Sequence, residues 1–186
     1  MRITADTNIL VRAIIEDEPD QSRLAQDILA RAGLVALPLP VLCELAWVLG
    51  QGYRIPAADI AATLRRLIDS ATVAVNRPAA EAGLAMLTEG GDFADGVIAY
   101  EGRVLGAGSF VSFDRLAVRL LEARGTKALV PGLPAFHRAA DQPSPPGGPF
   151  WLPDPQAFRP IGLGLPHRYF PRVDMRVRDV NLARLR

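Results

Sequence analysis

Apolar residues along the chain fall into two alternating patterns. Short continuous runs bounded by glycine, proline or polar residues are typical of buried strands. Longer segments, in which apolar residues recur about every three to four positions, are typical of helices that pack on one face. The runs that resemble strands span residues 2–5, 34–40, 72–75, 109–113 and 128–131.

Segments with helical spacing separate these runs. Asp20 is placed to cap the first predicted helix, whose Leu24, Ile28 and Leu29 share a face and which Gly33 ends. A later helix has its apolar face at Ile60, Leu64, Leu67 and Ile68. The predicted helices span residues 21–32, 41–52, 58–70, 78–91, 93–107 and 114–125.

This alternation predicts an α/β fold with a parallel sheet, because parallel strands need crossover connections that helices usually supply. With 186 residues, 49% of them hydrophobic, the chain is long enough to bury a core. The pattern stops near residue 138, since proline supplies 9 of the last 49 residues against 7 of the first 137. We therefore expect one domain at residues 1–135 and an irregular, proline-rich, basic C-terminal extension at residues 136–186.

Charge and cysteine content limit the binding partners and the cellular compartment that we expect for this protein. The formal net charge of +1 gives no overall basic field, so a nucleic-acid partner has to be held by a local patch. Residues 1–137 carry 13 Lys and Arg against 16 Asp and Glu, or −3, and residues 138–186 carry 8 against 4, or +4. The single cysteine, Cys43, lies in an apolar run, which indicates a buried thiol in a reducing compartment. Without a signal-peptide pattern or an apolar stretch of about 20 residues, we expect a cytoplasmic protein outside the membrane.

Acidic residues follow the predicted strands. Asp6 ends the first strand, Glu44 lies in the helix after the second, and Asp114 follows "SFVSF". Asp92 and Asp95 start another helix. Ligand sites in parallel sheets form at the carboxyl ends of the strands, so these side chains could converge. Two carboxylates about 5 Å apart repel by about 3 kcal/mol at an effective dielectric of 20, and a divalent cation removes that repulsion. Oxygen ligands favour Mg²⁺ or Mn²⁺ over zinc.

The same acidic residues also have simpler explanations. Asp92 and Asp114 can each cap the helix that follows, Asp95 is favoured by the helix dipole, and Glu44 can face solvent. Asp6 is the hardest to explain in this way, because an unpaired carboxylate after a buried strand costs stability unless a cation or hydrogen bonds compensate it.

Four motifs together resemble a known family. They are "ITADTNILV" with Asp6, "ELAWVL" with Glu44, "DFADGVIA" with Asp95 and "FVSFDRLAVRL" with Asp114. In this order and in these strand and helix contexts they resemble the PIN-domain ribonucleases, and more narrowly the VapC toxins of prokaryotic toxin–antitoxin pairs. The resemblance covers about residues 1–135. It departs from the family after Asp114, where a further acidic residue and an aromatic are often found and this chain has Leu116 and Ala117.

The resemblance implies a PIN-like three-layer fold with a central parallel sheet flanked by helices. It also implies a Mg²⁺-dependent (or Mn²⁺-dependent) endoribonuclease with an RNA substrate, a cognate antitoxin and commonly a homodimer. The residues that would bind the metal or orient its water are Asp6, Glu44, Asp95 and Asp114. Asp92 would be accessory, and the polar neighbours that could hydrogen-bond the carboxylates are Thr7, Asn8 and Ser112.

Further residues and the domain as a whole have alternative interpretations. Arg12, Arg115 and Arg119 are candidates for RNA contacts or ordinary solvated side chains. Trp47 is a candidate for core or dimer packing rather than for a platform on which bases stack. The domain could instead be a metal-free RNA-binding or dimerisation scaffold whose acids are caps, or a phosphatase or DNA flap nuclease using the same acids. The arginines of the extension, from Arg172 to Arg186, could cover the acidic cluster as an autoinhibitory segment. Alternatively, the segment could be an ordinary extension, or out-of-frame read-through, that stays disordered.

Overall fold

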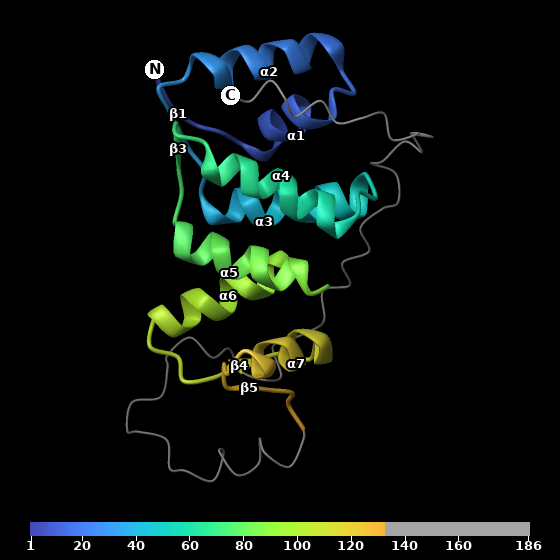
Figure 1. Cartoon of the computed structure of the whole chain (residues 1–186), viewed down its shortest axis with the longest axis vertical. Helices are drawn as coiled ribbons and strands as arrows, with labels where there is room; N and C mark the ends of the chain where they lie inside the picture. Colours follow the sequence, from blue (N-terminus) through green and yellow to red (C-terminus); the bar gives the residue numbers. More distant parts are fainter. Residues whose placement is uncertain (133–186) are drawn as a thin grey trace, which may run out of the picture.

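The computed structural model describes residues 1–132, which form an elongated α/β structure (Figure 1). Its strands are short and its helices make up most of the mass. The strands are β1 (Arg2–Thr4), β2 (Leu34–Ala36), β3 (Val73–Ala74), β4 (Phe110–Val111) and β5 (Ala128–Leu129). The helices are α1 (Thr7–Ile15), α2 (Pro19–Arg31), α3 (Leu39–Trp47), a π-helical turn η1 (Val48–Gly52), α4 (Ala57–Asp69), α5 (Arg77–Thr88), α6 (Phe93–Val104) and α7 (Arg115–Ala123).

All strand pairs in these residues are parallel, as the alternating pattern predicts, and the α/β class is confirmed. The strands form two sheets rather than one continuous sheet. One sheet has the order β1-β2-β3, with Ile3 opposite Val35 and Val35 opposite Val73. The other pairs β4 with β5, with Phe110 opposite Ala128.

The two sheets lie at different ends of the molecule. In Figure 1, β1 is near one end of the long axis, β4 is near the other, and the α5–α6 hairpin lies between them. Each end has its own hydrophobic core. The larger core surrounds the three-stranded sheet and includes Leu10, Val35, Leu64 and Phe93. The smaller core packs α7 and β5 against the hairpin, and its members are Met86, Ala99, Ala117, Val118, Leu121 and Ala128.

Two glycines allow the hairpin to close tightly. A Cβ at Gly96 would lie 2.3 Å from the carbonyl oxygen of Ala82, and one at Gly83 would lie 2.8 Å from the ring of Phe93. Both distances are far below ordinary van der Waals contact. The close approach of α5 and α6 therefore requires glycine at these positions, and it fixes the helix that carries Asp95.

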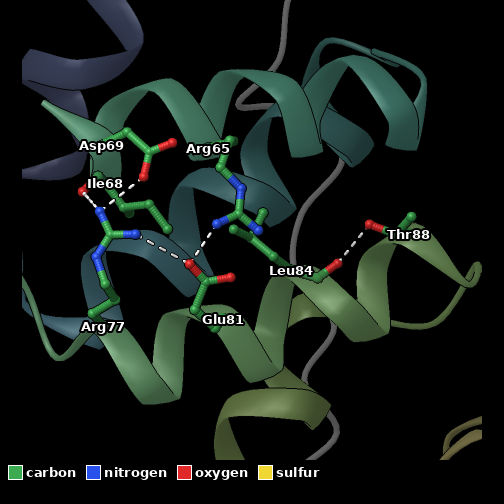
Figure 2. Close-up of polar contacts among 7 residues, drawn as sticks. All are labelled: Arg65, Ile68, Asp69, Arg77, Glu81, Leu84 and Thr88. Atoms are coloured by element: carbon green, nitrogen blue, oxygen red, sulfur yellow. Dashed lines mark hydrogen bonds and ion pairs between the residues drawn. The ribbon is translucent and has the colours of Figure 1, made fainter.

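Ion pairs join α4 to α5 on the surface (Figure 2). The Glu81 carboxylate accepts hydrogen bonds from Arg65 and, at 3.2 Å, from Arg77. Arg77 also donates to Asp69 at 2.8 Å and to the carbonyl oxygen of Ile68. The arginine thus holds the last turn of α4, where carbonyl groups lack intrahelical partners.

The helix predictions hold with two corrections. The apolar face predicted for α4 is buried at all of its positions: Ile60, Leu64, Leu67 and Ile68. In contrast, α2 begins at Pro19, so Asp20 lies in its first turn and Glu18 is the N-cap residue. Leu24 and Ile28 of this helix are exposed, because small Ser22 and Ala25 form its buried face.

Helix α1 has no counterpart among the predicted helices. Its sequence runs straight on from β1, with Ala5 and Asp6 as the only connection. The predictions for residues 136–186, including the autoinhibitory role of the arginines, fall outside the described residues. In residues 1–132 we find no helix long and apolar enough to cross a membrane.

Candidate active site

Asp6 lies at the junction of β1 and α1 with its carboxylate exposed. Its backbone carbonyl accepts from the amides of Ile9 and Leu10, which starts the helix, but its side chain makes no capping bond. The Nδ2 of Asn8 donates to the Asp6 Oδ2 at 3.2 Å. The carboxylate is therefore oriented by its neighbour and keeps oxygen lone pairs free for another partner.

Glu44 projects from α3 toward the start of α1. The hydroxyl of Thr7 donates to its Oε2 at 2.6 Å, a bond between residues 37 positions apart. Thr7 is only 4% exposed, whereas Glu44 is exposed. The buried hydroxyl thus links the two carboxylate-bearing elements, because Thr7 directly follows Asp6.

Asp92 and Asp95 lie at the start of α6. Asp92 is the N-cap residue, and its Oδ1 accepts from the amide of Ala94 at 2.7 Å. Asp95 follows in the first turn, where the helix dipole favours a negative charge. Burial raises the pKa of Asp95, and the negative charges of Asp92 and Asp114 raise it further. These three carboxylates therefore interact electrostatically.

Asp114 caps α7. Its Oδ1 accepts from the amides of Leu116 at 2.8 Å and Ala117 at 3.1 Å. The hydroxyl of Ser112 accepts from the backbone amide of Asp114 at 3.1 Å. Ser112 therefore shapes the turn that leads from β4 to α7 through a backbone bond, whereas Asn8 and Thr7 donate to carboxylates directly.

The candidate residues thus form two groups in this structure. The β1 group consists of Asp6 and Glu44 with Thr7 and Asn8, and the α6–α7 group consists of Asp92, Asp95 and Asp114 with Ser112. The carboxylate oxygens in both suit a hard divalent cation such as Mg²⁺ or Mn²⁺. However, no three acidic, histidine or cysteine side chains among residues 1–132 are arranged to hold one ion. The donor chemistry fits a metal, but the described part of one chain does not assemble a complete metal site.

The arginines that are candidates for RNA contacts differ in whether their side chains are bound to other residues of the fold. Arg12 pairs with Asp17 at 2.6 Å and donates to Gln21 at 3.0 Å, so this guanidinium is engaged within the fold. Arg115 and Arg119 are exposed on α7, next to the α6–α7 group in sequence.

A shallow groove lies beside α3, and no feature of the sequence predicts it. Trp47, Gln51, Gly91 and Asp92 contribute to its lining. Trp47 is 48% exposed, so the side chain expected in a core or dimer contact is half open to solvent in this chain. The groove combines residues from α3, η1, α4 and the α5–α6 turn. The residue spacing within any one of these segments does not indicate that they meet.

The comparison with protein families decides what this arrangement belongs to. The family model for the PIN domain matches residues 3–120. The chain belongs to the PIN domain family. PIN domains are generally metal-dependent nucleases, and all candidate acids of this PIN domain lie within the matched range. Comparisons with curated proteins and with solved structures gave no match.

Proposed function

We propose that this PIN domain is a divalent-metal-dependent endoribonuclease and acts as the toxin of a type II toxin–antitoxin pair. The observation that carries the proposal is the position of the acids. Asp6 follows one parallel strand, Asp114 follows another, and Glu44 and Asp95 lie on helices beside them. Both aspartates come after the carboxyl ends of parallel strands, which is where parallel sheets place their ligand sites.

The chain's own residues have distinct tasks in this proposal. Thr7 and Asn8 orient the β1 group through the hydrogen bonds described above. Asp92 and Asp114 hold the starts of α6 and α7, so that Asp95 is presented from a rigid turn. Exposed Arg115 and Arg119 supply positive charge for a phosphate backbone. A bound Mg²⁺ or Mn²⁺ would supply an activated water and charge stabilisation at the phosphodiester.

Cleavage assays on the purified full chain test the nuclease. Incubation with tRNA, mRNA and branched DNA, with Mg²⁺ or Mn²⁺ and then with a chelator, should give internal cleavage of RNA that the chelator stops. Asp6→Asn and Asp95→Asn should remove it. Asp27→Asn, at an exposed position of α2, is the control and should cleave like the unmodified chain. Cleavage of branched DNA alone would contradict the RNA assignment.

The toxin role has its own test. Expression of the chain in a bacterial host should arrest growth, and Asp6→Asn should relieve the arrest. A small neighbouring reading frame with a DNA-binding N-terminus should encode a protein that copurifies with the chain and suppresses cleavage. Unimpaired growth at an expression level that gives measurable RNA cleavage in the lysate would argue against a toxin.

One observation favours the scaffold as the second candidate. Asp92 and Asp114 make the capping bonds that this alternative requires of them. Calorimetric titration of Mn²⁺ into the unmodified chain and into Asp6→Asn separates the two candidates. If the chain is a metal-dependent nuclease, the unmodified chain should bind Mn²⁺ more tightly than Asp6→Asn. If it is a scaffold, the two proteins should give the same heat of titration.

A further inference from the structure

Each of the two sheets has an edge that no strand of residues 1–132 covers. β1 and β3 are the outer strands of the order β1-β2-β3, and β4 and β5 are both outer strands of the other sheet. Of these four, β1 and β4 are the strands that a candidate acid follows, Asp6 after β1 and Asp114 after β4. The amide of Ala5 donates to Ala36 of β2, so the alternation of a parallel strand turns the N–H and C=O of Thr4 to the other side. The amides of Phe110 and Ser112 donate to Lys127 and Leu129, so those of Val111 likewise face away from β5. Such edges are templates for a further strand.

The β4 edge adjoins an uncovered apolar face. Phe110 packs against the smaller core, and the next side chains alternate across the sheet. Val111 is 49% exposed and Phe113 is 79% exposed, and both lie on the opposite face. Parallel sheets are normally covered on both faces, so this bare face is unusual for a finished parallel sheet.

The separation of the two sheets also separates the candidate acids. Asp6 follows the open strand β1, and Asp114 follows the open strand β4. If these two strands paired in parallel, both residues would lie at one edge of one continuous sheet. The two open strands and the two incomplete acid groups are therefore parts of one arrangement that this chain does not close within residues 1–132.

We propose that a second copy of this chain closes it, with β4 of each copy pairing in parallel with β1 of the other. The combined sheet then has the order β3-β2-β1 followed by β4 and β5 of the second copy. Each metal-binding site then joins Asp6 and Glu44 of one copy with Asp114 of the other, while Asp95 lies on α6, which packs against α3 within its own chain. This inference rests on the proposed function for the role of the site, but the pairing of strands does not depend on it.

Two features favour a second copy over closure within one chain. β1 and β4 lie at opposite ends of the long axis (Figure 1), so two copies running in opposite directions place each β4 at the other's β1 end. A symmetric dimer of this kind pairs the β1 and β4 edges of both chains. Closure within one chain would instead have to pull α7 and β5 away from Met86 and Ala99, which hold them in the smaller core.

Proline and threonine at one position test the pairing. Val111→Pro removes the backbone N–H at the open edge of β4. Proline is tolerated on an edge strand whose N–H faces solvent, so the chain itself should still fold. Val111→Thr keeps the N–H and is the matched control. By light scattering of the full-length chain, the unmodified protein and Val111→Thr should be dimers and Val111→Pro a monomer with an unchanged circular dichroism spectrum. A monomeric unmodified protein, or equal masses for the two variants, would overturn the proposal. Val111→Asp provides a second disrupting variant if Val111→Pro does not fold.

Complementation tests the shared site. Asp6→Asn and Asp114→Asn homodimers each carry a lesion in both sites, but a mixed dimer has one site with both aspartates. An equimolar mixture after subunit exchange should recover about a quarter of the unmodified activity, since about half of the dimers are mixed and each has one intact site. An inactive mixture beside an active unmodified chain would overturn the shared site. If the unmodified chain cleaves no RNA, the proposed function fails. The molecular masses of the Val111 variants from light scattering still decide whether β1 and β4 pair between two copies.

Discussion

Thr7 and Glu44 are joined by a 2.6 Å hydrogen bond in which a buried hydroxyl donates to an exposed carboxylate. The bond ties the first residue of α1 to the middle of α3 and so fixes Glu44 relative to Asp6, the neighbour of Thr7. Its energetic contribution can be separated from the rest of the core, because each partner can be removed alone.

A double-mutant cycle measures this bond. We expect Thr7→Val and Glu44→Ala together to destabilise the protein by about 1 kcal/mol less than the sum of the two single changes, as is typical for one intramolecular hydrogen bond. Urea denaturation gives the free energies. Thr63→Val with Glu44→Ala is the control cycle. The buried Thr63 hydroxyl donates to the backbone carbonyl oxygen of Asp59 within α4, so the effects of these two changes should add. Additivity in both cycles would mean that the Thr7–Glu44 bond contributes nothing.

Gly96 should tolerate no side chain. Gly96→Ala places a Cβ 2.3 Å from the carbonyl oxygen of Ala82, so α6 must move from α5, at a cost of about 1 to 3 kcal/mol. Gly102→Ala on the same helix is the matched control. Its Cβ would meet nothing closer than 3.9 Å, and the change should stabilise the helix by up to about 1 kcal/mol. Thermal unfolding of the two variants should therefore shift in opposite directions, and equal shifts would refute the tight helix contact.

Glu81 should contribute stability that depends on pH. The hydrogen bond from Arg65, together with the charges of Arg65 and Arg77, holds the pKa of Glu81 below its usual value against the opposing effect of burial. A lowered folded-state pKa means that the contribution is complete above the unfolded pKa of about 4.3 and is lost as pH falls through the folded pKa. Because the side chains are partly exposed, Glu81→Gln should cost only about 0.5 to 1 kcal/mol at pH 7.

Urea unfolding at pH 7 and pH 3 checks this dependence. The difference between the unmodified protein and Glu81→Gln should shrink as the pH falls from 7 to 3, because protonation of the carboxyl removes its interaction with the two arginines. Glu122→Gln, at an exposed position of α7, controls for general effects of removing an acid. A difference that stays constant with pH would exclude an ionic contribution from Glu81.

Asp114 offers a way to separate capping from chemistry. Asparagine caps helices about as well as aspartate, so Asp114→Asn should stay within about 0.5 kcal/mol of the unmodified stability, while Asp114→Ala should lose about 1 kcal/mol. If the carboxylate serves the reaction, both variants should lose about 100-fold or more in RNA cleavage. Full activity in the stable asparagine variant would reduce Asp114 to a helix cap.

Cys43 should react slowly with alkylating agents. Burial, and then the negative charges of Asp92 and Glu101, raise the pKa of its thiol to about 11. Because only the thiolate reacts, alkylation by iodoacetamide at pH 8 should be about 100-fold slower than for a free cysteine. Mass spectrometry follows the reaction, and unfolding in urea should restore the ordinary rate. Equal rates in the folded and unfolded states would contradict the burial of this thiol beside α6.

Local sequence patterns account for much of the fold and less of the site. The face of α4 was readable because its four apolar residues repeat at helical spacing and all are buried. Helix α2 was misread because Ser22 and Ala25 face the core, where small side chains allow close packing, and hydropathy alone ranks them below Leu24. Helix α1 was missed although Asp6, its N-cap residue, separates its apolar residues from those of β1.

The acidic residues show the same limit. Their identities and their places after strands or at helix starts follow from local sequence, and so do the caps at Asp92 and Asp114. The pairing of strands does not follow from local sequence, because the hydrophobic pattern of β4 is the same whether it pairs with β5 alone or with both β5 and β1. Whether two groups of carboxylates meet therefore depends on long-range packing, which Met86 and Ala99 influence from the α5–α6 hairpin.

The α5–α6 hairpin also suggests an order of folding. Its two helices are neighbours in the chain, so their contact requires the closure of only a short loop. Phe93 enters the larger core and Met86 the smaller one, so both cores condense on a unit that can form early. We expect the hairpin to be structured in the folding transition state, with the two strand-bearing ends of the molecule assembling on it afterwards.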